Sequence, residues 1–92
     1  MNDLEFNWND KKNILLKKER NICFEDVVTA IKNDKLLDII KNQSENHPNQ
    51  YCLIIDISSS AYIVPFVQEG NIFFLKTMYK SRKQTKKYFK GV

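Results

Sequence analysis

Three segments rich in branched and aromatic residues follow one another between positions 51 and 79, and they constrain the fold more than any other feature. Residues 51–58, 61–69 and 71–79 each have the composition of a β-strand. Residues 58–60 and 69–71 join them and are of turn-forming types. Connections this short require antiparallel neighbours, so the sequence predicts a three-stranded meander. Pro65 lacks a backbone N–H, so we expect its strand to be locally at an edge or bulged there.

The N-terminal part is expected to begin with a short strand and a helix. Phe6 and Trp8 alternate with polar residues, as in a strand or an extended arm. Asn9 or Asp10 can cap a helix over residues 11–20, which Asn21 ends. Its predicted packing stripe consists of Ile14, Leu15 and Leu16, with the lysines left in water.

A second helix is expected to begin near Cys23 or Phe24, because acidic residues follow in its first turn and apolar residues recur at helical spacing. Residues 36–40 form a further apolar unit, either helical or extended. The polar segment 42–50, which contains His47 and Pro48, is predicted to be a loop. Ser81 is a credible N-cap for a last helix over residues 82–89, which Gly91 would stop.

This order of elements predicts an α+β fold in a single domain over residues 1–92. We expect an antiparallel β-sheet with the N-terminal helices on one face and a short basic C-terminal helix, leaving the opposite face for a partner. No run approaches the roughly 18 apolar residues that a membrane-spanning helix requires, and the N-terminus lacks a basic and then apolar leader. A cytoplasmic protein is therefore expected.

Charge is distributed unevenly along the chain. Seven of the fifteen Lys and Arg residues lie within residues 76–92, which contain no Asp or Glu, whereas residues 1–75 carry eight cations and eleven acids. A neutral-to-acidic body with a basic end is typical of a protein that meets a polyanion, most often nucleic acid. The alternative is a solvated terminal helix that maintains solubility.

The two cysteines, Cys23 and Cys52, are far apart and have no companion cluster of histidines. They cannot form a zinc site by themselves, and no metal or other cofactor is expected. We interpret them as buried or half-buried thiols, since a reducing cytoplasm disfavours the alternative of a disulfide.

Two segments of the sequence carry recognisable motifs. Residues 6–13 (FNWNDKKN) have the pattern F-x-W-x-x-x-K-N and are followed by a lysine-rich helix and CFEDV at 23–27. Residues 79–88 (YKSRKQTKKY) form a basic segment near the end. Together they resemble BrnT-type toxins of bacterial type II toxin–antitoxin systems, which have the same first motif, an S-F-E-E-like helix start and a closing S-x-R-K-A-T-K-K-like segment. Cys23 replaces the family's Ser cap, and the family's Arg on the last strand has no clear counterpart, Lys76 being the nearest basic residue.

The resemblance implies a RelE-like fold and a ribonuclease that cleaves mRNA and so inhibits translation. It also implies a cognate antitoxin encoded nearby, of ribbon-helix-helix or related type, and contact with RNA, either free or associated with the ribosome. Neither a membrane nor a metal has a part in this hypothesis.

Metal-free RNA cleavage requires a base, an acid and cations that stabilise the charged phosphate. Four residues near the last strand and helix are the candidates for catalysis: Lys76, Tyr79, Lys80 and Arg82. Arg82 is the expected phosphate clamp beside the helix N-terminus, Lys76 a charge stabiliser or base, and Tyr79 a stacking platform or proton donor. The expected RNA-binding lysines are Lys83, Lys86, Lys87 and Lys90.

Each of these assignments has a structural alternative. Arg82 can be an ordinary surface residue, and Lys76 can be an edge-strand lysine that prevents aggregation. Tyr79 can be a core residue whose hydroxyl reaches solvent. His47 is a minor candidate for acid or base, and an exposed loop histidine is its simpler interpretation. For the protein as a whole, the alternatives are a non-enzymatic RNA- or ribosome-binding module, or a protein that mainly binds a partner.

Overall fold

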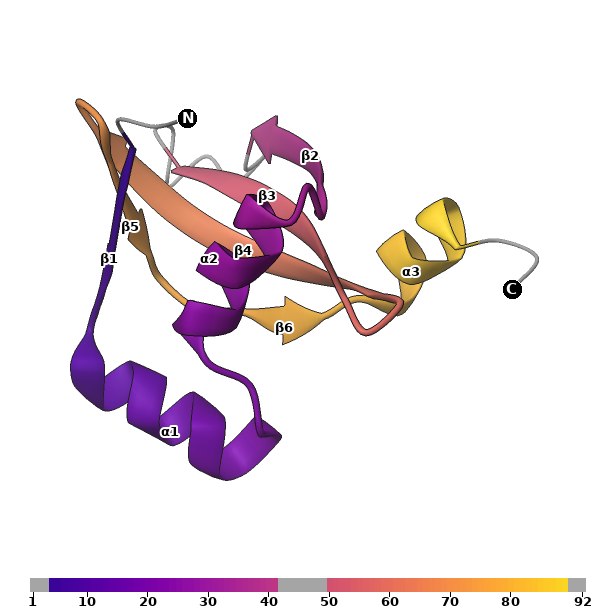
Figure 1. Cartoon of the computed structure of the whole chain (residues 1–92), viewed down its shortest axis with the longest axis horizontal. Helices are drawn as coiled ribbons and strands as arrows, with labels where there is room; N and C mark the ends of the chain where they lie inside the picture. The colour runs from indigo at the N-terminus through magenta and orange to yellow at the C-terminus, as the bar shows by residue number, and fades with distance from the viewer. Residues whose placement is uncertain (1–3, 42–49, 90–92) are drawn as a thin grey trace.

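The computed structural model describes residues 4–41 and 50–89. It has mixed α and β structure with a six-stranded sheet (Figure 1). The elements in chain order are β1 (Glu5–Trp8), α1 (Asp10–Arg20), α2 (Phe24–Lys32), β2 (Leu36–Lys41), β3 (Gln50–Ile57), β4 (Ser60–Glu69), β5 (Ile72–Leu75), β6 (Tyr79–Lys80) and α3 (Arg82–Tyr88).

The sheet has the strand order β1-β5-β4-β3-β2, and β6 also pairs with β4. The predicted antiparallel meander is confirmed in β3, β4 and β5. The prediction of a wholly antiparallel sheet is wrong at one edge, because β1 pairs parallel to β5 with Phe6 opposite Phe73. Parallel strands need a long crossover connection. Two helices and three strands lie between β1 and β5 in the chain, so the connection is long enough.

Two tight turns hold the meander together. Ser58 and Ser59 both have positive φ, at 54° and 63°, and Asp56 accepts a hydrogen bond from the Ser59 N–H. Two consecutive residues of this conformation match the right-handed twist of a hairpin. Gly70, with φ at 59°, occupies the turn between β4 and β5. Both predicted connections are therefore confirmed.

The predicted strand over residues 71–79 is divided into β5 and β6. Met78 turns into the core between them and is fully buried. Opposite this interruption lies Pro65, whose carbonyl accepts a hydrogen bond from the Lys76 N–H. The register between β3 and β4 runs through Pro65 unbroken, so the strand is not bulged there. On the side of β4 that faces β5 and β6, neither strand has a residue in register with Pro65. The strand is therefore locally at an edge there, as the missing N–H predicts.

The first helix begins and ends where the sequence indicates. The Asn9 side chain caps its first turn, and Asn21 ends it in the left-handed conformation with φ at 56°. The predicted packing stripe is wrong in part, because only Leu16 of the three apolar residues is buried. Ile14 and Leu15 are exposed, since they lie on the side of the helix that faces away from the sheet.

The second helix packs against β3 and β4 and supplies one wall of the core (Figure 1). Phe24 is fully buried and stacks on Trp8, with ring centroids 5.6 Å apart. Asn13 joins the two helices, because its side chain accepts a hydrogen bond from the Phe24 N–H and donates one to Glu25. The buried cluster comprises Leu16, Ile22, Phe24, Val27, Ala30, Leu53, Ile55, Val64, Phe66, Phe73, Leu75 and Met78.

Both cysteines are free thiols, as predicted. Cys52 is buried, and burial raises its pKa. Cys23 is half-buried at the start of α2, where its N–H donates to the Asp26 carboxylate in a capping box. The helix start therefore forms without the Ser that the resemblance would place there, and burial raises the pKa of this thiol too.

The apolar unit at residues 36–40 is extended and forms most of β2, at an edge of the sheet. Residues 42–49 of the predicted loop, including His47 and Pro48, lie outside the described residues, and Gln50 already belongs to β3. Within residues 4–41 and 50–89, no helix is long and apolar enough to cross a membrane.

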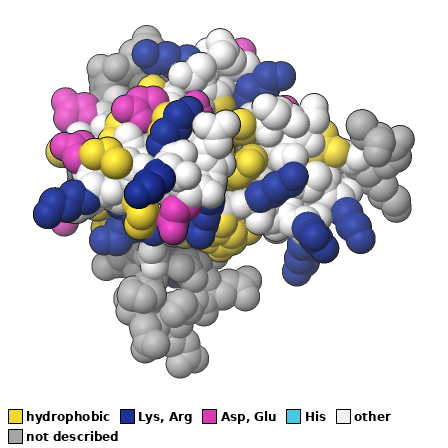
Figure 2. All heavy atoms as spheres, turned by 90° about the horizontal axis from the view of Figure 1, so that it is seen from below, with side chains coloured by type: hydrophobic (Ala, Val, Ile, Leu, Met, Phe, Trp, Pro, Cys, Tyr) yellow, Lys and Arg dark blue, Asp and Glu magenta, His cyan; other side chains and the backbone are white. Residues whose placement is uncertain are grey.

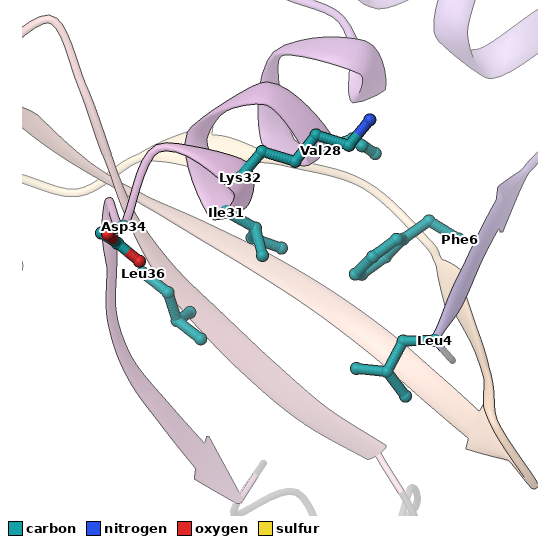
Figure 3. Close-up of a pocket in the computed structure, with 7 residues that line it drawn as sticks. All are labelled: Leu4, Phe6, Val28, Ile31, Lys32, Asp34 and Leu36. Carbon is teal, nitrogen blue, oxygen red and sulfur yellow. The ribbon is translucent and has the colours of Figure 1, made fainter. Parts of the chain in front are cut away.

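A hollow of about 800 Å³ lies between α2, β1 and the start of β2 (Figure 3). Its apolar side chains are all half-buried and approach it from both sides. Its lining residues are Leu4, Phe6, Val28, Ile31, Lys32, Asp34 and Leu36.

Candidate nucleic-acid interface

The sheet face that points away from α2, here called the outer face, carries exposed aromatic side chains at its β5–β6 end. Successive strand residues point to opposite faces, so burial of Phe73 and Leu75 in the core turns Phe74 outwards. Phe74 is 37% exposed and lies between Asn7 of β1 and Val67 of β4 in the register. Residues directly opposite in a pair share a face, so Tyr79, opposite Ile63, also points to the outer face.

Lys76 lies beside Phe74 on this face. Its Nζ is 5.2 Å from the centroid of the Phe74 ring, within the range of a cation–π attraction. The two side chains line a hollow of about 350 Å³, together with Asn7, Val67, Glu69 and Ile72. A cation, a carboxylate, an amide and an exposed ring therefore meet at one concave site.

The last helix borders the interface and is held in place by its first turn. Ser81 caps α3 by accepting a hydrogen bond from the Gln84 N–H, and its own N–H donates to the carbonyl of Ala61 in β4. The Thr85 hydroxyl accepts a hydrogen bond of 2.9 Å from the Ala61 N–H and donates one of 2.6 Å to the Ser81 carbonyl. A helix of seven residues is thereby fixed to the sheet, although it has no fully buried residue of its own.

The other end of α3 extends towards β2. The Tyr88 hydroxyl donates a hydrogen bond of 3.3 Å to the Asp38 carboxylate. Burial, together with the adjacent negative charge of Asp38, raises the pKa of Tyr88, so the phenol remains protonated and able to donate at neutral pH. Tyr88 and Phe89 are both half-buried, and the Tyr88 hydroxyl connects the end of α3 to β2.

The exposed cations of α3, here called the α3 basic surface, are Arg82, Lys83, Lys86 and Lys87. Dark-blue side chains gather over α3 at the right of Figure 2. Within residues 4–41 and 50–89 there is one ion pair, Lys35–Asp56. None of the acids in these two ranges therefore forms an ion pair with the α3 basic surface. Its charge is available to a polyanion. Lys90, which was predicted to extend it, lies outside the described residues.

The structure divides the predicted catalytic group between two faces. Lys76 and Tyr79 lie on the outer face, whereas Lys80 is opposite Tyr62, which packs against the core on the α2 side. Lys80 therefore points away from Tyr79. Arg82 begins α3 and is exposed. The N-terminus of α3 was predicted to offer N–H groups to a phosphate, and one of them, the Gln84 N–H, is already occupied by Ser81.

Three residues of this region were not singled out from the sequence. Phe74 had a detectable signal, because alternation in β5 places one of the two adjacent phenylalanines outside. Glu69 had none, since only the fold brings it to the hollow that Lys76 also lines. Arg20 donates a hydrogen bond of 2.8 Å to the Met78 carbonyl and so holds the end of α1 against the segment between β5 and β6.

No group of three or more His, Cys, Asp or Glu side chains that could hold a metal ion occurs among the described residues. The models of known protein families gave no match to this chain, and a comparison with curated proteins gave no match either.

Proposed function

We propose that this protein binds single-stranded RNA on the outer face and cleaves it without a metal ion. The observation that carries the proposal is that the exposed aromatic rings of Phe74 and Tyr79 share the outer face with Lys76, in a chain whose α3 basic surface carries no ion pair among the described residues. Aromatic rings next to cations are the usual means of gripping single-stranded nucleic acid, because bases stack on the rings and phosphates meet the charges.

The hollow at Lys76 supplies the groups for chemistry. The Glu69 carboxylate is the base that takes the proton of the ribose 2′-hydroxyl, and Lys76 stabilises the charge that develops on the phosphate. Tyr79 stacks on a base or donates a proton to the leaving 5′-oxygen, and Arg82 clamps a neighbouring phosphate. Lys80 points to the opposite face of the sheet, so it takes no part in this arrangement.

The resemblance to BrnT-type toxins gives this activity a context. The proposal includes a RelE-like arrangement of the elements, a cytoplasmic location and inhibition of translation through mRNA cleavage. It also includes neutralisation by a cognate antitoxin, of ribbon-helix-helix type, encoded nearby. These points rest on the two similar segments at residues 6–27 and 79–88.

The test is incubation of the purified protein with an end-labelled single-stranded RNA in EDTA, with the products identified by mass spectrometry. We expect fragments ending in a 2′,3′-cyclic phosphate, and a loss of rate of about 100-fold or more for Lys76→Ala and Glu69→Gln. Lys32→Ala, an exposed lysine on α2, is the matched control and should retain full activity. Intact RNA with the unaltered protein would contradict the enzymatic part of the proposal.

The second candidate function is a non-enzymatic RNA- or ribosome-binding module. The titratable side chains that line the hollow are those of Glu69 and Lys76. This small number favours a binding role without catalysis. In that case the same assay should show RNA that is retarded but uncut, with binding that weakens steeply as salt rises.

A further inference from the structure

The outward side of α1 carries an arrangement that the RNA interface does not use. Ile14 is 68% exposed and Leu15 is 45% exposed, and they lie next to each other on the helix surface. Residues three and four apart are neighbours on a helix, so Lys11 adjoins both aliphatic residues on one side and Lys18 adjoins both on the other. We call Lys11, Ile14, Leu15 and Lys18 the α1 strip.

The strip faces away from the body of the protein. At about 100° per residue, its four members fall within roughly one third of the helix circumference, opposite the buried Leu16. The inward side is occupied, since Asn13 bonds to α2 and Arg20 bonds to Met78. α1 lies at the lower left of Figure 1, and the view from below in Figure 2 shows yellow, dark-blue and magenta side chains intermingled on the left side of the molecule.

The charge around the strip is positive. The helix carries five cations, Lys11, Lys12, Lys17, Lys18 and Arg20, against two acids, Asp10 and Glu19. No ion pair engages these cations within the part of the chain that the structure describes. Asp10 lies one turn before Ile14 and Glu19 one turn after Leu15, so each edge of the strip also has an acid. The cations still exceed the acids on this helix, and an aliphatic pair with Lys11 and Lys18 beside it is complementary to apolar anchors flanked by carboxylates.

We propose that the α1 strip is a docking site for an acidic amphipathic helix of a protein partner. The apolar anchors of such a helix, at i, i+3, i+4 and i+7, pack on Ile14 and Leu15, and its flanking Asp and Glu side chains meet Lys11 and Lys18. The strip spans about 10 Å, or about two helical turns, so the contact is small and the complex is transient.

The composition of the strip separates this partner from other polyanions. The bases of single-stranded RNA stack on aromatic rings or guanidinium planes, and the strip contains neither. A helix that binds a membrane surface presents a broad apolar face, often with Trp or Phe, whereas here two aliphatic residues lie between lysines. The proposal is independent of RNA cleavage, because none of its residues belongs to the outer face or to the α3 basic surface.

The probe for the test is a helix-forming peptide of about 18 residues with Leu at the i, i+3, i+4 and i+7 positions and Glu elsewhere. Two matched peptides replace every Glu by Gln or every Leu by Ala. Binding is measured on the full-length protein by NMR titration, which reports both the location of the shifts and the dissociation constant.

We expect shifts confined to α1 with the Leu/Glu peptide, and binding at least tenfold weaker for each matched peptide. The double variant Ile14→Ser/Leu15→Ser and the charge reversal Lys11→Glu/Lys18→Glu should each weaken binding about tenfold or more. All four positions are exposed, so circular dichroism should show an unchanged fold. The matched reversal Lys83→Glu/Lys86→Glu on α3 should leave peptide binding as it was.

Several outcomes would overturn the proposal. They are the absence of shifts on α1, equal binding of the Gln peptide, and peptide shifts centred on α3 or the outer face. Three further results would assign the strip to a different occupant: loss of RNA affinity in the α1 variants, binding to phosphatidylserine vesicles that requires Ile14 and Leu15, or self-association that the serine variant abolishes. RNA cleavage should be unchanged in every α1 variant, so failure of this proposal is distinguishable from failure of the proposed function.

Discussion

The two basic helices at the ends of the chain, α1 and α3, differ in what accompanies their charge. The cations of α1 enclose two exposed aliphatic residues, whereas those of α3 border a sheet face with exposed aromatic rings. Positive charge alone attracts any polyanion, and the uncharged groups beside it select the class of partner. On this ground we propose a protein segment as the partner of α1 and RNA as the partner of the surface next to α3.

The largest effect is expected where α1 is anchored. Leu16→Ala should lower the free energy of unfolding by about 2–5 kcal/mol, because it removes buried atoms and leaves a cavity. The neighbouring Leu15→Ala, on the exposed side, should change it by no more than about 0.5 kcal/mol. Denaturation with urea measures both. Equal losses would show that the α1 strip is packed against the protein and is not free to bind.

The attachment of α3 gives the next effect. Thr85→Val keeps the shape of the side chain but leaves the N–H of the buried Ala61 without its partner, so we expect a loss of about 1–3 kcal/mol in the free energy of unfolding. Thr29→Val on the exposed surface of α2 is the control and should be close to neutral. A neutral Thr85→Val would mean that α3 is held by its other contacts.

The aromatic face should respond specifically to RNA. Phe74→Ala should weaken binding of a single-stranded RNA by about 1–3 kcal/mol, the usual contribution of one stacked base. Ile14→Ala should leave RNA binding unchanged and weaken binding of the acidic peptide. Fluorescence anisotropy with both ligands measures the two variants. If both variants lost RNA affinity equally, the assignment of separate partners to α1 and α3 would be refuted.

The smallest effect compares one lysine from each helix. Lys86→Ala should reduce the dependence of log K on log salt for RNA binding by about 0.7, the contribution of one contact to a single-stranded phosphate backbone. Lys18→Ala on α1 should leave that slope unchanged. Binding isotherms at several salt concentrations give both slopes, and an equal reduction would extend the RNA interface to α1.

Local chemistry made much of the fold predictable. Asn9 and Ser81 cap helices because a side-chain oxygen can accept from the N–H groups of a first turn, whatever lies elsewhere. The turn at Ser58 and Ser59 likewise follows from the short distance between two β-rich segments. The sequence also located the cations of α3, since an acid-free run needs no fold to be recognised.

Which side of each helix or strand is buried, and which strands pair, were by contrast decided by the tertiary structure. Three consecutive apolar residues on α1 cover more than half a turn, so only the place of α1 beside Trp8 and Phe24 settled that Leu16 is inside.

The separation of Tyr79 from Lys80 arose in the same way, from their register with β4. So did the parallel pairing of β1 with β5, which lie more than sixty positions apart in the sequence. The local sequence of this chain was enough to decide where helices and strands form, because caps and turns act within a few residues. Which side of each became a surface depended on contacts between distant segments, and no local pattern encodes those.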